Sequence, residues 1–107
     1  ERITDDIIVA SGDNPKCYNN VVISKAADTM LAMAGIEATF VVARTSDSTV
    51  NISARSHKTI NVQRIMEKMG GGGHFNLAAC QLRDCSVAQA KNKLIETIMG
   101  ELAPKED

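Results

Sequence analysis

The chain is predicted to form an α/β fold, a mixed β-sheet with packed helices in the order β-α-β-β-α-β-α. Short apolar runs alternate with segments whose apolar residues recur every three or four positions, as expected for strands and helices. Turn-forming residues separate these segments. The length of 107 residues suits one domain over residues 1–107, and 44% apolar residues without tryptophan predict an aliphatic core.

The first strand and helix are predicted from an apolar run and a capped periodic segment. Ile7–Ala10 is the run, and Ser11–Pro15 has the composition of a turn. Asn20 is expected to cap a helix that reaches about Ala34 and stops at Gly35. The residues expected to face the core from this helix are Ile23, Ala27, Met30, Met33 and Ala34.

An antiparallel hairpin is predicted next, from strands Ala38–Arg44 and Val50–Ser56 joined by the turn Thr45–Thr49. Successive side chains of a strand point to opposite faces, so the second strand should present two different faces. One face carries Val50, Ile52 and Ala54, and the other carries Asn51, Ser53 and Arg55.

The last part of the sequence, from Asn61 onward, is predicted to form a helix, a strand and a second helix. Asn61 can cap the first helix, which the glycines at 70–73 end, and Ala78–Leu82 follows as a strand. Ser86 and Gln89 form a capping box for a final helix to about Leu102. The residues expected to face inward from these helices are Val62, Ile65, Met66, Met69, Leu94, Ile98 and Leu102.

The net charge of −1 and the pI near 6.1 argue against a broad electrostatic grip on nucleic acid. One local phosphate pocket remains compatible with this charge. Three cysteines without close pairing, Cys17, Cys80 and Cys85, favour a reducing, cytosolic setting over a disulfide framework. None shows zinc-ligand spacing with the two histidines.

Targeting signals are not expected in this sequence. No apolar run is long enough to span a membrane, and a signal peptide is not recognisable. Because the chain starts at Glu1 rather than methionine, we expect it to be a piece of a longer protein.

The most unusual stretch is Gly70-Gly71-Gly72-Gly73-His74. Ordering consecutive glycines costs much backbone entropy, so a compact domain tolerates them where the backbone must turn or approach something closely. Their N–H groups can converge on an anion, and the histidine adds a donor. The competing interpretation is a helix C-terminal glycine followed by a flexible linker, and His74 alone could equally be a capping or core histidine.

Arg55 is the second candidate, because an arginine fork matches two phosphate oxygens. Ser53 shares its face, and Ser56 lies at the strand end. The competing interpretation is a solvated arginine in a surface ion pair. A P-loop and a dinucleotide fingerprint are excluded, because the glycines follow a helix and precede a strand.

The residues suggest no catalytic site. The aspartates are scattered, and no local signature indicates a metal pair, a Ser-His-Asp triad or a Cys-His pair. From the residues alone, the chain is a phosphate- or nucleotide-binding module that is catalytically incomplete.

Three motifs together point to a known family: Asn-Ile-Ser-Ala-Arg-Ser at 51–56, Asn-Val-Gln at 61–63, and the glycine run with His74 before Ala78-Ala79. With these, nearly the whole chain resembles the DHH-associated C-terminal domain of the DHH phosphoesterase superfamily. The version it resembles occurs in GdpP-type cyclic-di-AMP phosphodiesterases of Gram-positive bacteria. The glycine motif alone would indicate only the superfamily.

The resemblance implies that a separate N-terminal domain carries the Asp-His-His motif and two manganese ions, and that this chain binds no cofactor itself. The enzyme would hydrolyse one phosphodiester of cyclic-di-AMP to give pApA, and the isolated domain would be inactive. By position, the implied substrate-binding residues are Ser53, Arg55, Ser56, Asn61, Gly71, Gly72, Gly73 and His74, with Ser53 and Asn61 the weaker matches.

The resemblance also implies partners and a location. The partners would be cyclic-dinucleotide or short-oligonucleotide phosphates and a DHH catalytic domain in the same polypeptide, without membrane contact by this domain. The full-length protein could dimerise and be membrane-anchored with this domain in the cytoplasm. Phe75-Asn76-Leu77 and Cys80 depart from the family's usual residues, which could change how the base is held.

Other classes stay open. The same domain type occurs in DHH oligoribonucleases and RecJ-like single-strand exonucleases. The near-neutral net charge argues against binding of a long stretch of nucleic acid. Alanyl-tRNA synthetases end in a similar nucleic-acid-binding module, against which His74 counts. The remaining alternative is a structural α/β domain with a glycine hinge.

Overall fold

The computed structural model describes residues 1–13 and 18–103 of the chain. Its strands and helices, in chain order, are β1 (Arg2–Thr4), β2 (Ile7–Gly12), α1 (Asn20–Leu31), β3 (Ala38–Arg44), β4 (Thr49–Ser56), α2 (Val62–Lys68), β5 (Gly72–Gly73), β6 (Leu77–Arg83) and α3 (Val87–Leu102). The predicted fold class, a mixed sheet with packed helices, is confirmed.

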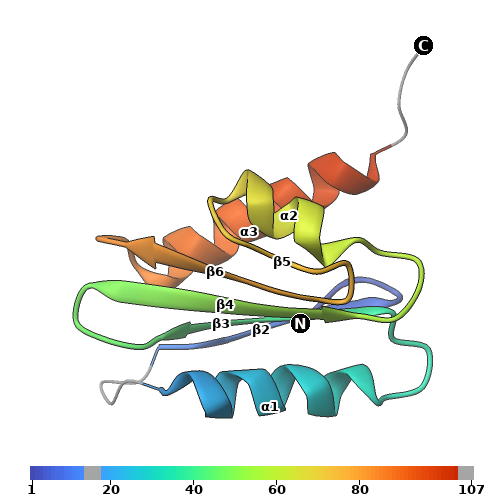
Figure 1. The fold of residues 1–107 in the computed structure, drawn as a ribbon, viewed down its shortest axis with the longest axis horizontal. Helices are drawn as coiled ribbons and strands as arrows, with labels where there is room; N and C mark the ends of the chain where they lie inside the picture. The colour runs from blue at the N-terminus through green and yellow to red at the C-terminus, as the bar shows by residue number, and fades with distance from the viewer. Residues whose placement is uncertain (14–17, 104–107) are drawn as a thin grey trace.

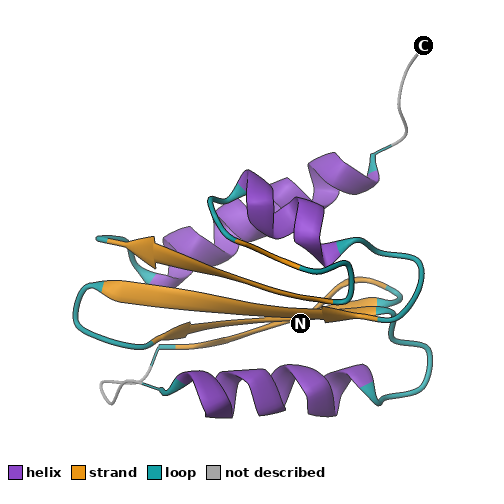
Figure 2. Cartoon of the chain, viewed as in Figure 1, coloured by secondary structure: helices purple, strands orange, loops and turns teal. Residues whose placement is uncertain are grey.

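The strands form one six-stranded sheet in the order β1-β2-β3-β4-β6-β5. β2 and β3 are parallel, joined through α1, and the other neighbours are antiparallel. Figure 1 shows α1 on one side of the sheet and α2 and α3 on the other. The same three-layer arrangement of helix, strands and helices is coloured by element in Figure 2.

Two cores of different size hold the layers together. The larger lies between the sheet and α2 and α3 and includes Phe40, Ile52, Ile65 and Leu94, all fully buried. The smaller lies under α1, where Ile23 and Ala27 pack on Val41 and Ala43 of β3. Both cores are mainly aliphatic, as the composition without tryptophan predicts.

Side-chain caps fix the starts of α2 and α3 as predicted. The Asn61 side chain accepts a hydrogen bond from the N–H of Arg64 at 3.2 Å. Ser86 and Gln89 form the predicted capping box, with bonds of 3.0 and 2.8 Å between side chains and backbone. These bonds satisfy N–H groups that the first turn of a helix leaves unpaired.

Two strands were not predicted from the sequence. β1 pairs antiparallel with β2 although its sequence, Arg-Ile-Thr, is mostly polar. β5 consists of two glycines that pair with β6. Both lie at the edges of the sheet, where one partner strand suffices and an apolar pattern is not required.

Other differences concern the ends of helices. α1 is capped by Asn19 rather than Asn20, and it ends at Leu31 rather than near Ala34. Ala34 and Met33 are therefore exposed instead of filling the core, and Leu102 is 41% exposed because α3 ends there. β2 runs to Gly12, into the segment predicted as a turn. Asn14, Pro15 and Cys17 lie outside the described residues.

Candidate functional site

The glycine run ends α2 and then forms the edge strand β5, so the flexible-linker interpretation is wrong. Gly70 has φ +89° and donates to the Glu67 carbonyl at 3.1 Å, while Gly71 donates to the Met66 carbonyl at 2.8 Å. This is the helix ending that glycine favours, because residues with a Cβ rarely adopt positive φ. The remaining two glycines pair with Ala78 and Ala79 of β6.

Only some of the glycines are required by the fold. A Cβ on Gly71 would lie 2.2 Å from the Ala79 carbonyl oxygen, and one on Gly73, whose φ is +145°, would lie 2.5 Å from backbone atoms of β6. At Gly72 a Cβ would meet no heavy atom within 4 Å, and φ is not positive there. Gly72 therefore has room for a side chain that the sequence does not use.

The register places Gly72 on the face of the sheet that α1 covers only partly. Ala78 and Cys80 of β6 face the large core, so their neighbours Leu77, Ala79 and Gln81 face the other way. Gly72 is opposite Ala79, and His74 exchanges two backbone hydrogen bonds with Leu77. We call this surface the open face; its residues are Gly72, His74, Leu77, Ala79 and Gln81.

The open face is accessible because α1 packs on β3 and β4 and stops short of covering β6. Leu77 is 51% exposed, and His74, Ala79 and Gln81 are exposed as well. Gly72 and Ala79 make its centre almost free of side chains. A ligand could therefore approach the backbone closely there.

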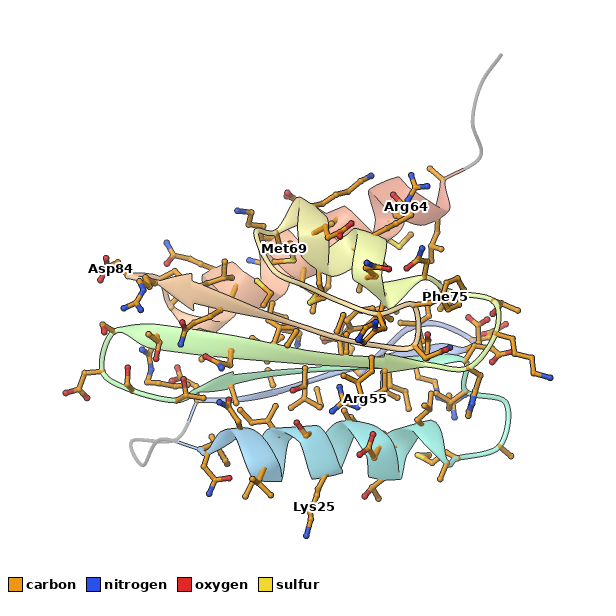
Figure 3. All side chains as sticks on the ribbon, viewed as in Figure 1. Lys25, Arg55, Arg64, Met69, Phe75 and Asp84 are labelled. Carbon is orange, nitrogen blue, oxygen red and sulfur yellow. The ribbon has the colours of Figure 1, made fainter. Side chains whose placement is uncertain are left out.

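Arg55 lies at the border of the open face, directly opposite Leu77 in the sheet. Figure 3 shows its side chain projecting from β4 toward α1. Its Nε donates to Asp28 Oδ1 of α1 at 2.9 Å, and its Nη1 donates to the Ala54 carbonyl at 2.9 Å. The arginine is 9% exposed, so it is not the solvated side chain of the competing interpretation, although it does form the ion pair that this interpretation named.

One end of the Arg55 guanidinium stays available. Nη2 has no hydrogen-bond partner among the described residues. It nevertheless reaches solvent, because no buried side-chain nitrogen in the described part of the chain lacks a partner. The arginine is thus held by α1 and β4 with free N–H groups at the edge of the open face, a geometry suited to a phosphate oxygen.

The three remaining predicted residues lie near Arg55 in different ways. Ser53 is buried on the same face, its hydroxyl 3.5 Å from that of Ser24 on α1. Ser56 points to the opposite face and donates to the Phe75 carbonyl at 3.2 Å. Asn61 caps α2, and the N–H of Val62 that follows it also donates to Phe75, at 3.0 Å. In the structure, the Ser56 hydroxyl and the Val62 N–H hold the turn after His74, and Asn61 caps the helix to which Val62 belongs.

The arrangement offers anion donors from three directions. Because His74 and Leu77 form a hydrogen-bonded pair, antiparallel alternation directs the N–H of Gly73 away from β6, at the outer edge of the sheet. His74 and Arg55 lie in the same row across the sheet, on either side of Leu77. Such donors can position a phosphate but do not supply a nucleophile.

A metal site of three or more ligands is not supported within the described residues, and Cys80 is not placed for thiol chemistry. Among the described residues, no three His, Cys, Asp or Glu side chains are grouped so that they could hold a metal ion. Cys80 lies in the large core and donates to the Met69 carbonyl at 3.3 Å, and burial raises the pKa of its thiol. Cys80 is therefore an unreactive core residue, on the face away from the candidate site.

Three hollows of the described surface lie outside the open face. One of about 350 Å³ is at the C-terminal end of α1, near Gly35 and His57. Smaller ones lie beside Tyr18 and beside Cys85. The candidate site is instead a shallow surface, which could enclose a ligand only together with another body.

Sequence reasoning missed a set of polar residues at the far end of the open face. Asn51 Nδ2 donates to Asn20 Oδ1 at 2.8 Å, and Gln81 Nε2 lies 3.4 Å from Asn51 Oδ1. The three residues come from α1, β4 and β6. The alternation of β4 and β6 could have placed Asn51 and Gln81 on one face, but not Asn20 beside them.

Comparison with known proteins identifies the family of the chain. The model of the DHHA1 domain matches residues 5–103. The cyclic-di-AMP phosphodiesterase PdeA of Listeria monocytogenes is 47% identical over 94 residues, which are 88% of this chain. The chain covers 14% of that relative's length.

Two solved structures share the fold. The C-Ala domain of Aquifex aeolicus alanyl-tRNA synthetase aligns with a TM-score of 0.58 at 18% identity, covering 86% of this chain and 87% of that one. A pGpG-specific phosphodiesterase of Vibrio cholerae, PggH, aligns with a TM-score of 0.59 at 15% identity, covering 92% of this chain and 35% of that one.

Proposed function

The chain belongs to the DHHA1 domain family, and we propose that it holds the substrate phosphates of a DHH-type phosphodiesterase that hydrolyses cyclic-di-AMP to pApA. Its similarity to relatives named cyclic-di-AMP phosphodiesterases supports this substrate. The observation that carries the proposal is the open face, where Gly72 lacks a side chain that the fold would accommodate. A glycine at a position where the fold would accept a side chain is consistent with a surface on which a ligand approaches the backbone.

In this proposal the substrate phosphate lies over Gly72 and Ala79, next to the row that carries Arg55 and His74. Arg55 donates from its free end while Asp28 and Ala54 hold the rest of the guanidinium in place. The N–H of Gly73 and the His74 side chain are the further donors. Ser53 lines the border under α1, and Gly71 brings β5 against β6. Ser56 bonds to the turn that presents His74, while Asn61 caps α2, whose first N–H bonds to the same turn.

Catalysis in this proposal requires a second domain. Phosphodiester hydrolysis needs a nucleophile and a means of stabilising developing charge, which paired metal ions supply. The described residues do not fit such a metal site. We therefore assign the two manganese ions to an N-terminal DHH domain of the same polypeptide, which would close over the shallow open face. Alone, the chain 1–107 would bind weakly and not hydrolyse cyclic-di-AMP.

The setting of the whole protein is part of the same proposal. Among the described residues, every helix is too short or too polar to cross a membrane. We place the domain in the cytoplasm, within a longer protein that can carry a membrane anchor and form a homodimer.

Steady-state kinetics of the complete enzyme test the assignment. Arg55→Ala and His74→Ala should each raise KM for cyclic-di-AMP, by about tenfold or more for Arg55, because a charged hydrogen-bond donor contributes about 1.5–3 kcal/mol. Arg55→Lys should restore only part of the loss, since a lysine lacks the planar fork. Arg64→Ala is the control, because this exposed arginine pairs with Glu101 at a distance from the open face. Unchanged kinetics in both alanine variants would refute the proposal.

A further inference from the structure

The polar end of the open face is built from three amide side chains on three different elements. Asn20 lies on α1, Asn51 on β4, and Gln81 directly opposite Asn51 on β6. Thr45 adds a hydroxyl that donates to Asn51 Oδ1 at 2.9 Å. The function proposed above uses none of these residues.

The hydrogen bonds fix how the amides are oriented. Asn51 Oδ1 accepts from Thr45, so the Asn51 Nδ2 faces Asn20, to which it donates at 2.8 Å. Gln81 can then approach Asn51 Oδ1 only with its Nε2 group, at 3.4 Å. This leaves the second N–H and the Oε1 of Gln81 without a partner among the described residues, on an exposed side chain.

An amide with one free N–H and a free carbonyl oxygen matches one edge of adenine. Adenine presents the N7 acceptor beside the N6 amino donor, which an Asn or Gln side chain can bind with two hydrogen bonds. Guanine presents two acceptors on this edge, N7 and O6. With Nε2 directed to Asn51, the Gln81 carbonyl would face the guanine O6, and the two acceptors would repel each other.

The position of Gln81 suits a base whose phosphate lies over Gly72. Gly72 is opposite Ala79, and Gln81 is two residues further along the same strand and face. At roughly 3.4 Å per residue, the two places are about 7 Å apart along β6. This separation is comparable to the reach from phosphate to base edge within one nucleotide.

We infer that Gln81, oriented by Asn51, binds the N6–N7 edge of an adenine and makes the site select adenine over guanine. This inference rests on the proposed function, because it needs a nucleotide phosphate held at Gly72. The competing explanation is a surface hydrogen-bond network that only ties α1 to β4 and β6. That role would affect stability and leave base selectivity unchanged.

Kinetics of the complete enzyme with cyclic-di-AMP and cyclic-di-GMP separate the two explanations. In the Gln81→Ala variant, the ratio of kcat/KM for the adenine substrate to that for the guanine substrate should fall by about 5- to 100-fold, as expected for loss of a bidentate base contact. Gln81→Glu keeps the N6 acceptor but loses both the N7 donor and the bond to Asn51, so its activity on cyclic-di-AMP should lie below that of the unmodified enzyme and no lower than that of Gln81→Ala. Gln63→Ala, on α2, is the matched control.

Each outcome decides the inference. If the unmodified enzyme hydrolyses cyclic-di-AMP and Gln81→Ala has the same selectivity ratio, the inference is overturned and the proposed function stands. A complete enzyme that hydrolyses neither cyclic dinucleotide overturns both. If Gln81→Ala lowers the melting temperature, the test uses Gln81→Glu, provided that this variant is as stable as the unmodified enzyme. Activity of Gln81→Glu on cyclic-di-AMP equal to that of the unmodified enzyme would then overturn the proposed base contact.

Discussion

The two faces of the same sheet differ in chemistry although the same strands build them. Toward α2 and α3, β4 and β6 contribute Ile52, Ala54, Ala78 and Cys80 to an apolar, fully covered core. Toward α1, the alternate residues of these strands are mostly polar or small, and the part on β6 is open to solvent. In the proposed function, one strand serves stability with every second residue and ligand binding with the others.

The difference teaches where sequence changes should act. Substitutions on the covered face should change the free energy of unfolding, because the side chains there are buried in the core. Substitutions on the open face should change binding and leave stability almost intact. Pairs of neighbouring residues on one strand are therefore the sharpest tests.

The largest expected effect on stability is that of Ile52→Ala on the covered face. The side chain is fully buried in the large core, so removing it should cost about 2–5 kcal/mol of unfolding free energy. Chemical denaturation of the chain measures this loss. Leu77→Ala, at a half-exposed position of the open face, should cost far less. Equal losses for the two variants would contradict the division of the faces.

A smaller loss is expected for Gly71→Ala. The new Cβ would lie 2.2 Å from the Ala79 carbonyl oxygen, so β5 must shift away from β6. Forcing volume into such a contact costs about 1–3 kcal/mol. Thermal unfolding should show a clear drop in Tm, and a Tm equal to that of the unmodified chain would mean that β5 is not held against β6 as described.

The smallest stability effect is expected for Asp28→Ala, which removes the acceptor of the Arg55 Nε hydrogen bond. This carboxylate is 62% exposed, so its pair with Arg55 should contribute less than about 1 kcal/mol. Its loss should still loosen the Arg55 side chain and raise KM in the complete enzyme several-fold. Thr29→Ala on the same helix is a control that leaves the ion pair in place. An unchanged KM would show that Asp28 does not position the arginine.

The sequence predicts the elements whose apolar pattern matches their place in the fold. The stripe Val62, Ile65, Met66 and Met69 and the capping box at Ser86 are confirmed because each is local. β1 and β5 were missed because edge strands need no apolar pattern. Adjacent asparagines made the start of α1 ambiguous by one residue, and Asn20, freed from capping, bonds to Asn51 instead.

The candidate site was predictable only in part. The alternation of β4 correctly put Ser53 and Arg55 on one face, but the sequence could not show that α1 covers them and that Asp28 pairs with the arginine. The glycine run was recognisable, yet only the structure separates Gly71 and Gly73, which the fold needs, from Gly72, which it does not. Gln81 carries no local signal, and its setting arises from three elements far apart in sequence.

The most direct measurement of the central claim compares Gly72→Ala with Gly100→Ala in the complete enzyme, following both Tm and KM for cyclic-di-AMP. A Cβ has open space at both positions, and Gly100 lies on α3 away from the open face. The account predicts that neither variant loses stability and that only Gly72→Ala raises KM, because its methyl group occupies the place of the substrate phosphate. A Gly72→Ala enzyme with unchanged KM would contradict it.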